Sequence, residues 1–110
     1  MKTIPVVTTE TLAGYRITEH VGIVRGNTIR ARHIGRDILA GLKNIVGGEI
    51  NDYTKLMAES REQVLDRMVD EARLLQADAI VSVRFTTSML AQGAAELLVF
   101  GTAVKLEKID

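Results

Sequence analysis

The stretch 95–104 is predicted to be a β-strand with two apolar faces at its centre. Because side chains alternate along a strand, Leu97 and Val99 fall on one face and Leu98 and Phe100 on the other. A small two-layer domain normally buries only one face of its sheet. The second face therefore needs a second helix or another subunit to cover it. The sequence predicts only one long helix, so we favour another copy of the chain, with Leu98 and Phe100 in the contact.

That long helix is predicted from Asn51 to Ala77, because neither glycine nor proline interrupts this stretch. Asn51 suits the N-cap position, and Asp52 places a carboxylate in the first turn, where it stabilises the helix dipole. Apolar residues at helical spacing predict the buried stripe, which consists of Tyr53, Met57, Val64, Met68, Ala72 and Leu75.

A shorter helix is predicted before the long one. Glycines 47 and 48 are expected to end it, since glycine adopts the left-handed cap with least strain. Its apolar repeat consists of Ile34, Ile38, Leu42 and Ile45.

Alternating residues from Tyr15 onward predict a strand with Ile17, Val21 and Ile23 on one side. Further strands are expected at 4–9, at 28–32 after a turn at Gly26-Asn27, and at 79–87 before a loop near residues 92–93. The order strand, short helix, long helix, strand, strand predicts a single domain over residues 1–110. Its fold class is α+β, with two layers and a mainly antiparallel sheet.

Composition excludes several classes of protein. Cysteine is absent, so disulfides, thiolate metal sites and thiol nucleophiles are ruled out. Fourteen basic and fourteen acidic residues cancel, which argues against nucleic acid as a partner. No apolar stretch approaches the roughly 20 residues of a membrane-spanning helix. The N-terminus shows no signal peptide pattern, so a cytoplasmic location is expected.

Four blocks of residues carry a resemblance to a known family, namely 42–49 with Tyr53, Arg67-Met68 with Glu71-Ala72, 77–81, and 101–104. Over roughly Thr9 to Leu106 the chain resembles the YbjQ family. These are small bacterial and archaeal proteins of uncharacterised role that are labelled heavy-metal-binding. The resemblance implies a dodecin-like subunit assembled into a homopentameric ring.

Two positions depart from the pattern of that family. Gln76 stands where a glycine often precedes the Ala-Asp pair, and Ser82 stands where the following strand carries a glycine. Glycine at the first position would cap the helix, so Gln76 is expected to change how the helix ends. Neither departure is expected to alter the fold.

Metal binding has two weak candidate ligands, His20 and His33. Imidazole suits zinc, copper and nickel, but these histidines lack the spacing of a metal-binding motif. A ring could gather one histidine from each subunit around its axis. A surface or hydrogen-bonded structural role is the simpler interpretation. The residues identify no cofactor. The two histidines leave a bound metal ion possible.

A second candidate site is the basic run from residue 25 to residue 36. Its arginines lie close to a predicted helix start, and guanidinium groups suit phosphate or carboxylate. The alternative is that they are solvated or pair with acids of a neighbouring chain. The run contains Arg25, Arg30, Arg32 and Arg36.

Catalysis is not expected, because no complete constellation of catalytic residues is present. Glu49 and Asp52 are near neighbours, but both are explained as helix-start residues. Arg84 and Glu96 are charges within apolar strands that could meet across the sheet, and a buried or interface ion pair is their simplest interpretation. The sequence therefore favours a non-enzymatic, ring-forming protein that binds a small ligand or ion or serves as a scaffold. The alternative functions are metal binding through the histidines, and anion or nucleic-acid binding through the basic run.

Overall fold

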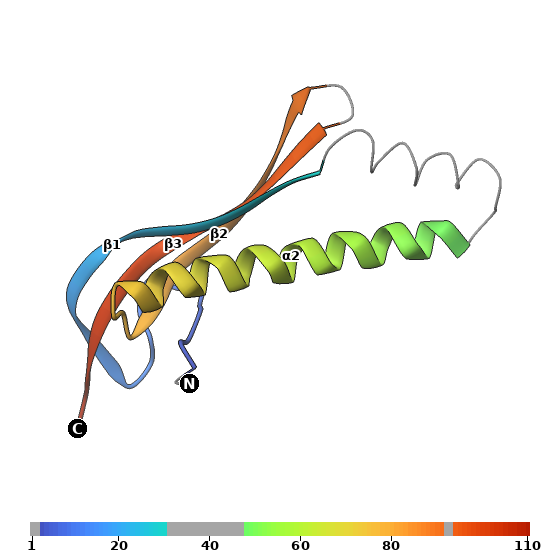
Figure 1. The fold of residues 1–110 in the computed structure, drawn as a ribbon. Helices are drawn as coiled ribbons and strands as arrows, with labels where there is room; N and C mark the ends of the chain where they lie inside the picture. The colour runs from blue at the N-terminus through green and yellow to red at the C-terminus, as the bar shows by residue number, and fades with distance from the viewer. Residues whose placement is uncertain (1–2, 31–47, 92–93) are drawn as a thin grey trace.

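The computed structural model of the chain describes residues 3–30, 48–91 and 94–110. Its elements are strand β1 (Tyr15–Arg30), helix α2 (Gly48–Leu74), strand β2 (Ala79–Ala91) and strand β3 (Ala94–Lys108). The strands form an antiparallel sheet in the order β1-β3-β2, and α2 lies across one face of it (Figure 1). The α+β class with one long helix on an antiparallel sheet is therefore confirmed. The predicted short helix over residues 34–45 lies outside the described residues.

The main core lies between α2 and the sheet. Val64, Met68 and Ala72 of α2 are fully buried there, which confirms the centre of the predicted apolar stripe. Leu75 is 40% exposed, because α2 already ends at Leu74. The buried residues of the sheet and the N-terminal segment that complete this core are Ile4, Val24, Ile80, Val83, Leu97, Val99 and Ala103.

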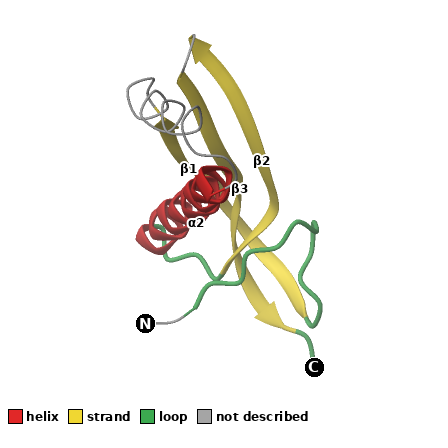
Figure 2. Cartoon of the chain, turned by 90° about the vertical axis from the view of Figure 1, so that its right-hand side faces the viewer, coloured by secondary structure: helices red, strands yellow, loops and turns green. Residues whose placement is uncertain are grey.

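A second, smaller core lies on the opposite face of the sheet. Ala79, Val81 and Val104 are buried in it. Val7 and Leu12 pack over these residues from the N-terminal segment, which we define as residues 4–14. Figure 2 shows this segment crossing only the part of the sheet nearest the C-terminus. One half of the face opposite α2 is thus covered by the chain itself.

The N-terminal segment also pairs with the outer edge of β2. Val7 donates its backbone N–H to the carbonyl oxygen of Ile80 (3.0 Å), and Ile80 donates to that of Pro5 (2.9 Å). Farther along, Val83 donates to Val7 (3.1 Å). The strand predicted at residues 4–9 is consequently reduced to one parallel bridge, between Val6 and Ile80.

Strand β1 runs straight through Gly26 and Asn27, so the turn predicted there is wrong. A Cβ atom on Gly26 would stand 2.0 Å from the carbonyl oxygen of Val64 in α2. Glycine is needed at this position for the close approach of the helix, not for a change of chain direction. Residues 28–30, which were predicted to begin a separate strand, are the end of β1.

Two irregularities in β1 also break the predicted alternation. The register with β3 shifts between Ile17 and Glu19 and again between His20 and Gly22. Each shift inserts one unpaired residue and so turns the following side chains to the other face. As a result, Ile17 packs on the smaller core, whereas Val21 packs on the main core beside α2.

The ends of α2 differ from the prediction. The helix begins at Gly48, so Asn51 lies inside it and is not the N-cap. At the other end, Ala77 donates its N–H to Ala72 (3.1 Å) and Gln76 donates to Arg73 (3.0 Å), which is the Schellman pattern. Gln76 adopts φ = 60°, the left-handed conformation that glycine favours. The expectation that Gln76 would change the helix end is therefore wrong.

Candidate functional site

The half of the sheet that the N-terminal segment leaves uncovered, on the face opposite α2, is the candidate site; we call it the open half-face (Figure 2). Its large apolar side chains are exposed: Ile23 by 75%, Ile29 by 53% and Phe100 by 37%. The register places its residues in cross-strand rows, which are Ile23–Thr102, Arg25–Phe100–Arg84, Asn27–Leu98–Thr86 and Ile29–Glu96–Ser88.

The two apolar faces predicted for β3 are confirmed. Leu97 and Val99 are buried under α2. Leu98 is half-buried and Phe100 is exposed on the open half-face. Within the described residues nothing packs over this half, so its covering by another copy stays a prediction.

An irregularity in β2 places Arg84 on the open half-face. The register of β2 with β3 shifts between Val81 and Arg84, so that Arg84 stands opposite Phe100. In a regular strand Val83 would occupy that place, and the bulge turns it toward the main core instead. The extra residue is accommodated at Ser82, which adopts φ = 54°. This is the position where the family pattern has glycine.

The guanidinium of Arg84 is anchored by the backbone. Its Nη1 donates to the carbonyl oxygen of Thr8 in the N-terminal segment (2.9 Å) and to that of Val83 (2.8 Å). A pairing of Arg84 with Glu96 across the sheet of one chain is wrong, because Glu96 lies opposite Ser88, farther along β2. Glu96 instead accepts a hydrogen bond from Nδ2 of Asn27 (3.2 Å).

Of the predicted anion-binding arginines, Arg25 lies on the open half-face and is exposed. Arg30 is the last residue of β1. Arg32 and Arg36 lie outside the described residues, so their clustering stays a prediction. Sequence reasoning missed Arg84 as a companion of Arg25, because the bulge that brings both to one row has no sequence signature other than the family's glycine.

The metal candidates are not brought together by the described residues. His20 is exposed in β1, opposite Val104, and His33 lies outside these residues. The described part of the chain holds no group of three or more His, Asp or Glu side chains that could bind a metal ion. Glu49 lies in the first turn of α2, as its interpretation as a helix-start residue requires, whereas Asp52 lies in the second turn, because α2 already begins at Gly48. No helix of the described part is long and apolar enough to span a membrane.

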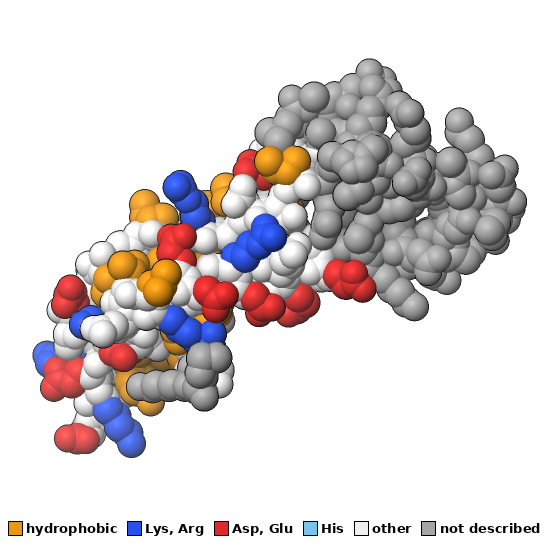
Figure 3. Space-filling view, in the orientation of Figure 1, with side chains coloured by type: hydrophobic (Ala, Val, Ile, Leu, Met, Phe, Trp, Pro, Cys, Tyr) orange, Lys and Arg blue, Asp and Glu red, His pale blue; other side chains and the backbone are white. Residues whose placement is uncertain are grey.

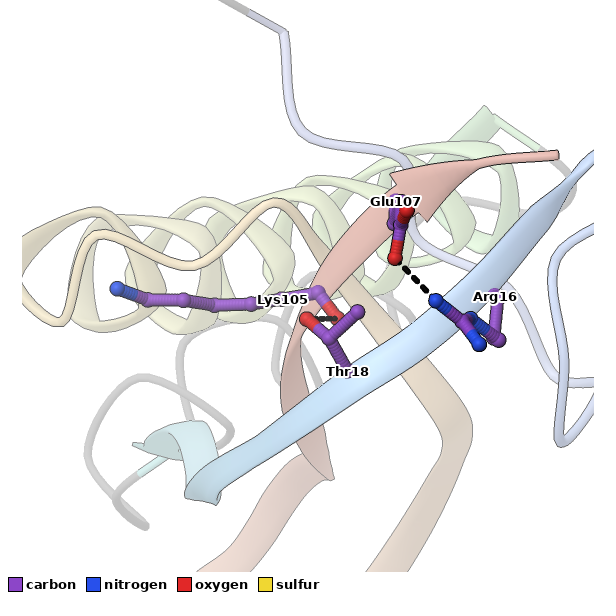
Figure 4. A network of polar contacts seen from close by, with 4 residues as sticks. All are labelled: Arg16, Thr18, Lys105 and Glu107. Carbon is purple, nitrogen blue, oxygen red and sulfur yellow. Dashed lines mark hydrogen bonds and ion pairs between the residues drawn. The ribbon is translucent and has the colours of Figure 1, made fainter. Parts of the chain in front are cut away.

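At the other end of β1 one arginine has a carboxylate partner. Arg16 forms an ion pair with Glu107 of β3, and both side chains are exposed (Figure 4). Close by, the hydroxyl of Thr18 donates to the carbonyl oxygen of Lys105 (3.3 Å) at the first register shift. Arg16 therefore provides a natural comparison for the arginines of the open half-face.

A groove of about 650 Å³ lies between α2 and β2. Phe85 and Leu65 supply its apolar lining, while Glu59, Glu62 and Asp66 supply carboxylates. Acidic side chains gather in a row along α2 in the space-filling view (Figure 3). The sequence did not predict this groove, because it arises from the placement of α2 over β1 and β3.

Fold and site together define a small α+β protein with one long helix on an antiparallel sheet, and with half of the other sheet face open. A family model described as "Putative heavy-metal-binding" matches residues 4–107. The chain therefore belongs to the YbjQ family, as its residue blocks indicated.

Known relatives are similar over nearly the whole chain. A "UPF0145 protein" of Archaeoglobus fulgidus is 57% identical over 105 residues, covering 96% of this chain and 97% of the relative. Another, from Methanosarcina acetivorans, is 52% identical over 101 residues, covering 92% and 95%. These names state no enzymatic activity.

A solved structure shows the same fold. It is a protein of unknown function from Pediococcus pentosaceus that belongs to the DUF74 family. It superposes with a TM-score of 0.62 and 16% sequence identity, covering 94% of this chain and 98% of that one. At this identity the likeness concerns the fold alone.

Proposed function

We propose that the chain is the dodecin-like subunit of a closed homo-oligomeric ring, with five copies as the family resemblance implies. In this ring a neighbouring copy covers the open half-face. The assembly is non-enzymatic and binds a small ligand or ion, or serves as a scaffold. The observation that carries the proposal is the exposure of Ile23, Ile29 and Phe100 on one and the same sheet face.

The energetics favour such a contact. Burying a large aliphatic or aromatic side chain contributes roughly 1.5–3 kcal/mol relative to leaving it in water. Ile23 and Ile29 lie on the same side of β1, with Phe100 on the adjacent strand, so one partner surface can bury all three.

The sheet edges support a ring. No described strand pairs with the outer edge of β1, and the N-terminal segment covers the outer edge of β2 only at residues 80–83. A bare strand edge offers N–H and C=O groups to another chain. Pairing of two different edges is a heterologous contact, which closes into a ring when the rotation between copies fits.

Two phenylalanine variants test the proposal by native mass spectrometry. Phe100→Lys places a charge on the open half-face, whereas Phe85→Lys places one on the α2 side, where Phe85 is 47% exposed. We expect a five-fold mass for the unmodified chain and for Phe85→Lys. Phe100→Lys is expected to give monomers or aggregates. A monomeric unmodified chain, or an intact ring with Phe100→Lys, would contradict the proposal.

Metal binding is the second candidate function, favoured by the description of the family model. His20 is exposed and has no companion ligands in the described part of its own chain. In a ring, His20 or His33 supplies one imidazole per copy, which suits zinc, copper or nickel. Replacing both histidines by alanine is then expected to abolish stoichiometric metal in elemental analysis of protein purified without chelator. Full retention of the metal would exclude these ligands.

A further inference from the structure

Arg25 and Arg84 carry two positive charges that have no carboxylate partner among the described residues. The ion pairs found there are Arg16–Glu107 and Arg73–Asp70. The acidic residue of the open half-face, Glu96, is bound to the amide of Asn27.

The two arginines flank one aromatic side chain. Arg25 on β1 and Arg84 on β2 both stand directly opposite Phe100 on the central strand β3. Directly opposite side chains have Cβ atoms about 5 Å apart, so the exposed side chain of Arg25 can reach toward the Phe100 ring, while the guanidinium of Arg84 starts from the same row and is held at Thr8. The bulge at Ser82 creates this row, because it puts Arg84 in place of Val83.

The donors of Arg84 are only partly occupied. A guanidinium has five N–H donors, and the carbonyl oxygens of Thr8 and Val83 bind those of Nη1. These bonds anchor the group, while Nε and Nη2 offer the paired donors that phosphate oxygens accept. Arg25 forms no hydrogen bond or ion pair with the described residues, so its guanidinium is entirely available.

We propose that the row Arg25–Phe100–Arg84 binds a doubly charged oxoanion, either inorganic phosphate or the phosphate group of a small molecule. The inference rests on the proposed function, because a neighbouring copy that covers the open half-face withdraws both guanidinium groups from water. Unpaired charges are costly to bury. A dianion between the two groups balances both charges, so the bound anion stabilises the assembled ring.

Phosphate titration of thermal unfolding tests this proposal at constant ionic strength, with sodium chloride as the balancing salt. The variants are Arg25→Gln and Arg84→Gln, and the control is Arg16→Gln, which removes an exposed arginine of β1 that already has a carboxylate partner. We expect phosphate to raise the unfolding temperature of the unmodified chain and of Arg16→Gln. The half-saturating phosphate concentration is expected to rise at least tenfold in the other two variants. Repeating the titration with adenosine monophosphate distinguishes a phosphorylated molecule from free phosphate.

The mass of the assembly, measured on the same samples, separates this inference from the ring proposal. A five-fold ring that phosphate does not stabilise overturns the anion site and leaves the ring intact. A monomeric chain overturns the ring. The site is also overturned if Arg16→Gln raises the half-saturating phosphate concentration as much as Arg25→Gln does, or if Arg25→Gln does not raise it. Because Arg84 holds Thr8 as well, Arg25→Gln decides the matter if Arg84→Gln fails to fold.

Discussion

The carbonyl oxygen of Val64 lies 2.0 Å from the point where a Cβ atom on Gly26 would stand. The backbone nitrogen of Met68 lies 2.8 Å from the same point. Helix α2 thus lies directly against the bare backbone of β1. This contact sets the height of the helix above the sheet, and with it the packing of Val64 and Met68, which are both fully buried.

Gly26→Ala is therefore expected to lower the free energy of unfolding by about 3 kcal/mol, because backbone atoms of α2 must move to admit the methyl group. Urea denaturation followed by circular dichroism measures the change. Thr87→Ala is the control, since Thr87 is an exposed residue of β2 that lies outside the open half-face. A Gly26→Ala variant as stable as the control would show that the helix does not rest on β1 in this way.

Gln76→Gly is expected to raise the free energy of unfolding by about 1 kcal/mol, because a side chain at φ = 60° is strained and glycine is not. Gln76→Ala keeps the Cβ atom and the strain, so it should show no such gain. Both variants are compared by urea denaturation. An equal effect of glycine and alanine would contradict the left-handed conformation at this position.

Regular periodicity allowed much of the fold to be predicted from the sequence. The stripe containing Val64 and Met68 identified α2, and simple alternation assigned Leu98 and Phe100 to the face opposite α2. Element ends were less accurate, as the start of α2 at Gly48 shows. A helix start depends on cap contacts that the identity of Asn51 alone does not determine.

The failures share a physical cause, which is that tertiary contacts decide what a local signal means. Gly26 permits a turn or a close approach, and only the position of α2 distinguishes them. The bulges in β1 and β2 each insert one residue, and each reverses the faces of the residues after it. The bulge at Ser82 therefore places Arg84 opposite Phe100, where a regular strand would have placed it opposite Val99.

Asp78 ties β3 to the connection between α2 and β2. Its Oδ2 accepts the backbone N–H of Leu106 (2.8 Å), and its own N–H donates to Val104 (2.8 Å). Asp78→Ala leaves the part-buried N–H of Leu106 without its acceptor, so we expect the free energy of unfolding to fall by about 1–3 kcal/mol. Asp78→Asn keeps an oxygen acceptor and should retain most of the stability. If the two variants were equally destabilised, the hydrogen bond to Leu106 would not be the cause.

Ile23 and Leu74 allow the open half-face to be tested against exposed apolar surface in general. Ile23 is 75% exposed on that face, and Leu74 is 85% exposed at the end of α2. If a neighbouring copy covers the open half-face, Ile23→Lys forces an ammonium group into an apolar contact. The association constant of the assembly should then fall at least tenfold, which corresponds to about 1.4 kcal/mol. Leu74→Lys places the same charge where no contact is proposed and should leave assembly unchanged. Light scattering across a dilution series measures both. If only the Leu74→Lys variant dissociated, the subunit contact would lie at the end of α2 and not on the open half-face.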